Sequence, residues 1–117
     1  MTASVTSIVE SMAAAWNAGD AERVLALAAQ ASRAEADSEG FLGLLGLAQQ
    51  QAGEYSQAAR TFERLARMQP GVSAWWNNLG VSYRHACDYS ASERALLKAK
   101  AVARGDSLTL GMAQFPP

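Results

Sequence analysis

Apolar residues recur at helical spacing in several stretches of the chain, which small turn residues separate. One stretch has apolar residues at relative positions i, i+3, i+4 and i+7, namely Phe41, Leu44, Leu45 and Ala48. The stretch after Gly53 repeats the pattern at Ala58, Ala59, Phe62, Leu65 and Ala66. This spacing places the apolar side chains on one face of an α-helix. The pattern therefore predicts an all-α chain built from paired amphipathic helices.

The turns between these helices recur at a fixed interval of 34 residues. The matching tripeptides are Gly19-Asp20-Ala21, Gly53-Glu54-Tyr55 and Cys87-Asp88-Tyr89. Gly46 and Gly80 have the same separation, and each follows a leucine. Because independent positions share one period, the sequence predicts three helix–turn–helix units, over residues 5–38, 39–72 and 73–106.

The ends of the units carry their own signals. The first unit is predicted to contain helices over about 4–18 and 21–34, and Pro70-Gly71 ends the second unit. Residues 107–115 are predicted to form a short helix with Asp106 or Ser107 as its N-cap. This helix either caps the stack or begins a fourth repeat that is cut short. The ending Phe115-Pro116-Pro117 favours a fragment of a longer protein.

A 34-residue helix–turn–helix unit resembles the tetratricopeptide repeat (TPR). The third unit matches the TPR motif at Trp76, Leu79, Gly80, Tyr83, Tyr89, Leu96 and Ala99, with Cys87 and Ser92 replacing the usual Gly and Ala. The middle unit matches at Leu42, Leu45, Gly46, Gly53, Tyr55, Ala58, Phe62 and Pro70, and departs at Gln49 and Leu65. The first unit is degenerate: it matches at Gly19, Val24, Ala28 and Ala31, and Met12 stands where Gly is usual.

The resemblance implies a TPR-type solenoid of antiparallel helix pairs, with residues 1–117 as a single domain. In such a stack Gly46 and Gly80 let neighbouring helices approach closely. Aromatic residues are expected to fill the gaps between units: Tyr55, Phe62, Trp76, Tyr83 and Tyr89. Single units cannot bury their apolar faces, so about three units are needed to form a core.

Composition and charge restrict the function classes. Hydrophobic residues make up 50% of the 117 residues and charged residues 18%, which favours a folded domain over disorder. Ten basic and eleven acidic residues were interpreted as massed in no single block, which argues against nucleic-acid and membrane binding. The N-terminus lacks the pattern of a signal peptide, and the apolar stretch 41–48 is too short to cross a membrane. A cytoplasmic location is therefore expected.

The sequence shows no pattern typical of catalysis, so we expect no enzyme activity of this chain, no cofactor and no metal. His85 and Cys87 are the only His and Cys, and residues two apart on a helix do not face one another. The glycines at 40, 43 and 46 match neither a dinucleotide-binding nor a P-loop spacing.

The resemblance also implies a binding site, because the first helix of each TPR lines a concave groove for a peptide or partner protein. By register, the predicted groove residues are Trp16, Asn17, Leu47, Gln50, Gln51, Asn77, Val81, Arg84 and His85. Trp16 is a candidate exposed anchor. Trp75 and Trp76 are interpreted as packing residues rather than an aromatic cage.

The predicted function is a protein–protein interaction module, bacterial in character. Three alternatives stay open: a TPR extension of an enzyme whose catalytic domain lies elsewhere, a secretion-type chaperone, and a self-assembling scaffold. The near-neutral charge counts against the chaperone. Self-assembly would make a homo-oligomer through the C-terminal helix, with apolar anchors at Leu108, Leu110, Met112 and Phe115.

Overall fold

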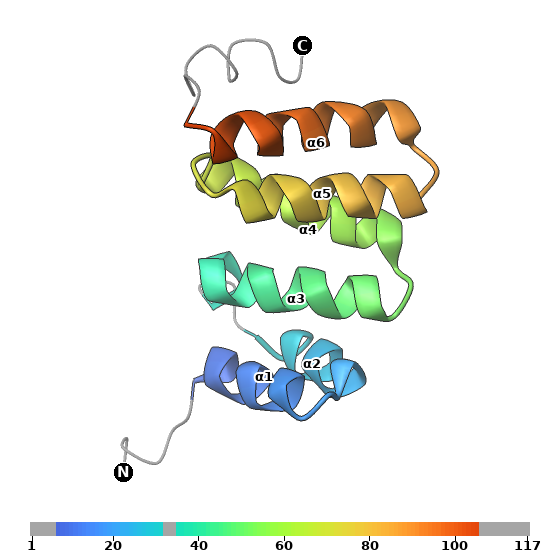
Figure 1. The fold of residues 1–117 in the computed structure, drawn as a ribbon. Helices are drawn as coiled ribbons and strands as arrows, with labels where there is room; N and C mark the ends of the chain where they lie inside the picture. Colours follow the sequence, from blue (N-terminus) through green and yellow to red (C-terminus); the bar gives the residue numbers. More distant parts are fainter. Residues whose placement is uncertain (1–6, 32–34, 106–117) are drawn as a thin grey trace. The chain divides into compact units, whose positions relative to one another are not determined.

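A computed structural model describes residues 7–31 and 35–105 of the chain. The described residues form six α-helices and one short 3₁₀ helix (Figure 1). The elements are α1 (Ile8–Asn17), α2 (Ala21–Ala28), η2 (Glu35–Asp37), α3 (Glu39–Gln51), α4 (Tyr55–Met68), α5 (Ser73–His85) and α6 (Tyr89–Ala103). The prediction of an all-α fold is confirmed.

The helices gather into two compact units that meet in sequence between Glu54 and Tyr55. In the first unit α1 packs on both α2 and α3, and α2 packs on α3. In the second unit α5 packs on both α4 and α6. Helices that follow one another in the sequence are therefore neighbours in space within each unit. The middle predicted repeat contributes α3 to the first unit and α4 to the second.

The helix boundaries follow the 34-residue interval in the second half of the chain. Helices α3 and α5 begin at Glu39 and Ser73, and α4 and α6 begin at Tyr55 and Tyr89. The first hairpin is shorter than predicted, because α1 begins at Ile8 and α2 ends at Ala28 rather than near residue 34. The chain tightens after α2, where two backbone N–H groups bond to carbonyls three residues back.

The three turns that close a first helix have one geometry. Gly19, Gly53 and Cys87 have φ angles of 78°, 82° and 69°, in the left-handed region. In each turn this residue donates its N–H to the carbonyl three residues back, at 2.9–3.0 Å. The next residue donates to the carbonyl five residues back, at 2.8–2.9 Å. This pair of bonds is the Schellman motif, whose left-handed position favours glycine. Cys87 therefore occupies a glycine position with a Cβ atom.

Side-chain caps begin most of these helices. Ser7 and Glu10 form a reciprocal capping box at the start of α1. Asp20 accepts a bond from the N–H of Arg23 at 3.0 Å, and Asp88 accepts one from the N–H of Ala91 at 3.2 Å. The acidic residue that follows each of these two turns thus ends one motif and caps the next helix.

The core of the second unit is built around large residues of α4 and α5. The fully buried side chains there include Phe62, Leu65, Trp76 and Leu79. The indole N–H of Trp76 donates to the carbonyl of Pro70 at 2.9 Å, which satisfies its one polar atom.

Gly80 allows α5 and α6 to approach closely, as the sequence predicted. A Cβ atom at this position would lie 2.6 Å from Cγ and Cδ2 of Leu96. The Ser92 hydroxyl donates to the Gly80 carbonyl at 2.8 Å across the same contact. In the first unit the corresponding position holds Met12, which is completely buried.

The aromatic residues expected between units divide into buried and exposed ones. Phe62 and Trp76 are buried, and Tyr55 and Tyr83 are half-buried. The prediction for Tyr89 is wrong, because its side chain is 64% exposed. Tyr89 is the first residue of α6. The predicted helix over 107–115 and its N-cap lie outside the described residues.

Candidate functional site

The predicted groove residues of the first unit lie at the C-terminal ends of α1 and α3, two helices that pack together. On α1, Trp16 is half-buried and Asn17 is exposed. On α3, Gln51 is exposed, and Leu47 and Gln50 are half-buried. The Trp16 ring is thus partly engaged in packing rather than fully free for a partner.

The predicted groove residues of the second unit all lie on α5. Asn77 and Arg84 are exposed and Val81 is half-buried, at spacings that follow one side of the helix. His85 is exposed, but its ring stacks on Tyr55 with 4.6 Å between ring centroids. This contact joins the C-terminal end of α5 to the N-terminal end of α4 and fixes the orientation of the imidazole.

The two adjacent tryptophans are packing residues within the second unit. Trp76 is only 2% exposed. Trp75 is half-buried and stacks on Phe62 with centroids 6.2 Å apart. Its indole N–H donates to the side-chain oxygen of Gln69 at 3.2 Å. An aromatic cage needs exposed ring faces that surround a ligand cation. The ring of Trp76 is buried and one face of Trp75 stacks on Phe62, so the two residues do not form such a cage.

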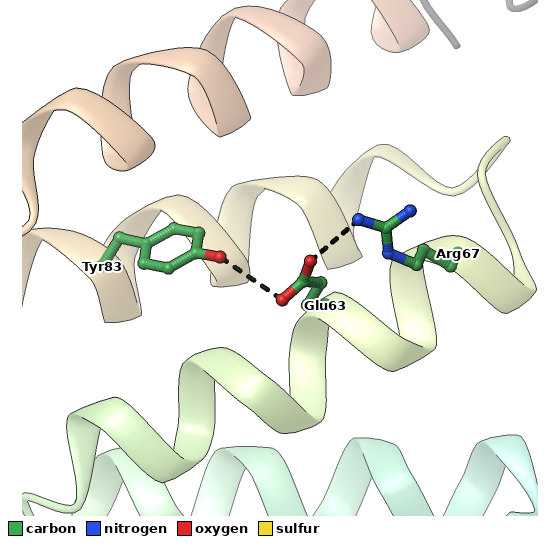
Figure 2. Close-up of polar contacts among 3 residues, drawn as sticks. All are labelled: Glu63, Arg67 and Tyr83. Carbon is green, nitrogen blue, oxygen red and sulfur yellow. Dashed lines mark hydrogen bonds and ion pairs between the residues drawn. The ribbon is translucent and has the colours of Figure 1, made fainter. Parts of the chain in front are cut away.

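A polar cluster ties α4 to α5 (Figure 2). The Glu63 carboxylate accepts a bond from Arg67 at 2.9 Å and a longer one from the Tyr83 hydroxyl at 3.5 Å. Burial raises the pKa of Tyr83 above its ordinary value, and the negative charges of Glu63 and Asp88 raise it further. A shallow cavity of about 280 Å³ lies beside this cluster. The cluster is a structural link, because each of its side chains bonds to another.

Lys98, on α6, is the one residue whose buried polar side-chain atom lacks a hydrogen bond among the described residues. Its side chain is 6% exposed, and its Nζ lies 5.6 Å from the centroid of the Trp76 ring. Burial lowers the pKa of Lys98 below its ordinary value. The electron-rich face of the Trp76 ring attracts the Lys98 ammonium and partly offsets the free-energy cost of its lost hydration.

The outer side of the α5–α6 hairpin carries a depression that sequence reasoning missed. Two adjoining cavities of about 480 and 320 Å³ share Leu96 and Lys100 in their walls. We call this continuous feature the α5–α6 trough. Its walls are formed by Ser73, Ala74, Asn77, Arg84, Tyr89, Ser92, Glu93, Leu96, Leu97, Ala99, Lys100 and Ala103.

The trough includes only two of the predicted groove residues, Asn77 and Arg84, on its α5 side. Its α6 side presents Tyr89 and Leu97, which are 64% and 58% exposed. Tyr89 and Leu97 were the available sequence signal, but the repeat motif assigned Tyr89 to packing between units, and no role was predicted for Leu97.

Acidic residues predominate in the first unit and basic residues in the second. The interpretation that neither sign of charge is concentrated in one part of the chain is therefore wrong. Residues 1–54 contain seven acidic and two basic residues, a net charge of −5. Residues 55–117 contain four acidic and eight basic residues, a net charge of +4. The division is not visible as a run of like charges, because the charged residues of each unit are spread along its sequence.

The described residues offer no group of three metal-ligating side chains. Cys87 is exposed, and in the described residues the neighbouring His85 is stacked on Tyr55 rather than set against the thiol. Over the same residues, no helix is both long enough and apolar enough to cross a membrane.

Comparisons with known proteins add no assignment. No family model matches the chain, and no curated protein or solved structure matches it either. The repeat geometry and the exposed surfaces of the two units are therefore the features that bear on function.

Proposed function

We propose that this chain is a TPR-type protein-binding module that holds a peptide or partner protein against the first helices of its repeats. The observation that carries the proposal is the recurrence of one turn geometry at residues 19, 53 and 87. A helix–turn–helix unit that recurs with the same turn geometry is the building unit of a helical solenoid. Solenoids of this kind use extended surfaces for binding.

The residue types on α5 support binding of a polypeptide. Asn77 can both donate and accept hydrogen bonds, and Arg84 donates only. An extended peptide offers matching backbone carbonyls and N–H groups, as well as carboxylates for the guanidinium. On α1 and α3 the exposed residues Asn17 and Gln51 supply further amides. The proposed ligand is therefore a polar segment of another protein, held without catalysis, cofactor or metal.

The proposal is tested by affinity capture from a lysate of the organism that encodes the chain. The test variant combines Asn77→Ala, Arg84→Ala and His85→Phe, in which Phe keeps a ring that can stack on Tyr55. A matched control combines Gln57→Ala, Arg60→Ala and Arg64→Ala, three exposed positions on α4. Far-UV circular dichroism verifies that both variants keep their helices.

The expected result is a partner that the wild type and the α4 control retain and that the α5 variant loses. A partner retained by all three proteins would show that the α5 face is not the binding surface. If none of the proteins retains a partner, the binding proposal itself fails, and a spacer or scaffold role replaces it.

A further inference from the structure

The α5–α6 trough has the properties of a protein interface rather than of an ordinary solvated surface. Leu97 and Tyr89 are large side chains exposed by more than half, beside the half-buried Leu96. The small residues Ala74, Ala99 and Ala103 line part of its walls and leave room for an approaching backbone. Large apolar side chains exposed together beside a depression are candidates for a contact site.

The charge around the trough is positive. Arg84 and Lys100 lie in its walls and are exposed, and Glu93 is the one acidic residue there. The trough belongs to the unit of net charge +4. A partner for this surface therefore combines apolar side chains with an excess of negative charge, since complementary potentials steer and align two surfaces.

The first unit of the same chain has the required excess of negative charge. Its net charge is −5, and the exposed Glu22 and Glu39 lie in the first turns of α2 and α3. Half-buried apolar side chains, such as Ile8 and Leu25, accompany these charges on its helices. Every copy of the protein thus carries a basic trough and an acidic unit in separate parts of its sequence.

We propose that the α5–α6 trough of one copy binds the acidic first unit of a second copy, so that the protein associates head to tail. The two contacting surfaces differ, so the contact is heterologous and leaves a free trough at one end and a free first unit at the other. Association therefore continues beyond a dimer. The trough overlaps the proposed peptide site at Asn77 and Arg84. The two proposals are tested separately through Leu97 and Lys100, which lie on α6 and are not among the predicted groove residues.

The test measures the mass of the intact chain by sedimentation velocity over a range of concentrations. The wild type is expected to show a rising average mass at about 20 mM salt. Association at 0.5 M salt is expected to be at least tenfold weaker, because the Debye length falls from about 20 Å to about 4 Å. A mass that stays at 12.4 kDa at every concentration at low salt overturns the proposal.

Two variants then separate head-to-tail contact from a symmetric dimer. The trough variant carries Leu97→Glu and Lys100→Glu, and the first-unit variant carries Glu22→Lys and Glu39→Lys. All four positions are exposed, so we expect both variants to stay folded by circular dichroism. Arg60→Glu on α4 is a control outside the trough that reverses one charge, as Lys100→Glu does, and it is expected to associate like the wild type.

Each variant alone is expected to be monomeric, because each lacks one of the two surfaces. An equal mixture is expected to form a 1:1 dimer and nothing larger, since the intact first unit of one variant fills the intact trough of the other. A mixture that stays monomeric, or a trough variant that still self-associates, overturns the proposal.

A chain truncated after Gly105 tests the other possible occupant, residues 107–115 of the same molecule. Association unchanged by the truncation supports the second copy as the occupant. Association that appears only after truncation shows that the intact chain covers its own trough, and this result also overturns the proposal.

Discussion

The first hairpin, α1 and α2, and the last hairpin, α5 and α6, show two ways of packing the same repeat. In the last hairpin Gly80 leaves space that Leu96 occupies. In the first hairpin the corresponding residues are Met12 and Ala28, so the large residue stands on the first helix and the small one on the second. Met12 is fully buried, as the large residue of a packed pair should be. The two pairs of side chains therefore have similar total volumes, but the large and small residues have exchanged helices.

In the turns, the glycine is in the first hairpin and the larger residue is in the last one. The first hairpin has Gly19 at the left-handed position, and the last has Cys87 at the same φ to within about 10°. The left-handed position is therefore filled without glycine in the last hairpin. A residue that departs from the repeat pattern on one helix, such as Met12, is thus tolerated when the facing position on the other helix changes with it, as at Ala28.

The largest expected effect comes from placing the residue of the first hairpin into the last one. Gly80→Met forces a side chain into the position of Leu96 and is expected to cost about 3 kcal/mol of unfolding free energy. Adding Leu96→Ala recreates the arrangement of the first hairpin. In a double-mutant cycle by urea unfolding we expect a favourable coupling of at least about 1 kcal/mol. Additive effects of the two changes would mean that volume exchange does not explain the difference.

The N-cap residues are expected to show where the two hairpins are alike. Asp20→Ala and Asp88→Ala each remove a carboxylate that accepts a backbone N–H bond. Each change is expected to lower the unfolding free energy by about 1 kcal/mol. Asp20→Asn and Asp88→Asn are the controls, because Asn caps a helix almost as well. A loss at only one of the two sites would contradict the equivalence of the turns.

The turn positions are expected to show where the hairpins differ. Cys87→Gly relieves a left-handed backbone but gives the unfolded chain more freedom, so we expect a net gain of about 0.7 kcal/mol. The reverse change, Gly19→Cys, is expected to lose a similar amount. Thermal unfolding of the two variants beside the wild type measures both effects. If Cys87→Gly and Gly19→Cys shift the unfolding temperature in the same direction, the backbone at Cys87 is not strained.

The smallest expected effect concerns Lys98, whose counterpart in the first hairpin is uncharged. Below the lowered folded-state pKa, the buried ammonium is charged and reduces stability. As the pH rises from that pKa to the ordinary value of 10.5, the folded chain loses its proton first and the unfolding free energy rises. Lys98→Met keeps the apolar stem, and we expect it to gain about 0.5 kcal/mol at pH 7.

The measurement for Lys98 is the pH dependence of urea unfolding for the wild type and Lys98→Met. Tyr83 acts in the opposite direction, because its raised pKa makes stability fall as the pH rises above 10. The difference between the two proteins isolates Lys98, since both keep Tyr83. The difference in unfolding free energy between the two proteins is expected to shrink as the pH approaches 10.5. A difference that does not change with pH would show that the charge of Lys98 does not affect stability.

The sequence by itself determined most of the helices and the turn positions, and it paired α1 with α2 and α5 with α6. The reason is local: helical spacing of apolar residues, caps and left-handed turn residues act within a few positions of each other. Period and spacing therefore located the turns at residues 19, 53 and 87, and they identified Gly80 as a point of close approach. The early end of α2 was missed, because no strong stop signal follows Ala28.

Only the tertiary structure decided which surfaces are filled and which are open. Tyr89 and Trp76 are both motif aromatics, yet one is 64% exposed and the other 2%. The stacking of His85 on Tyr55 and the burial of Lys98 over Trp76 likewise depend on residues far apart in the sequence. Burial depends on which helix packs against which face, and a periodic pattern is the same whether or not a neighbour is present.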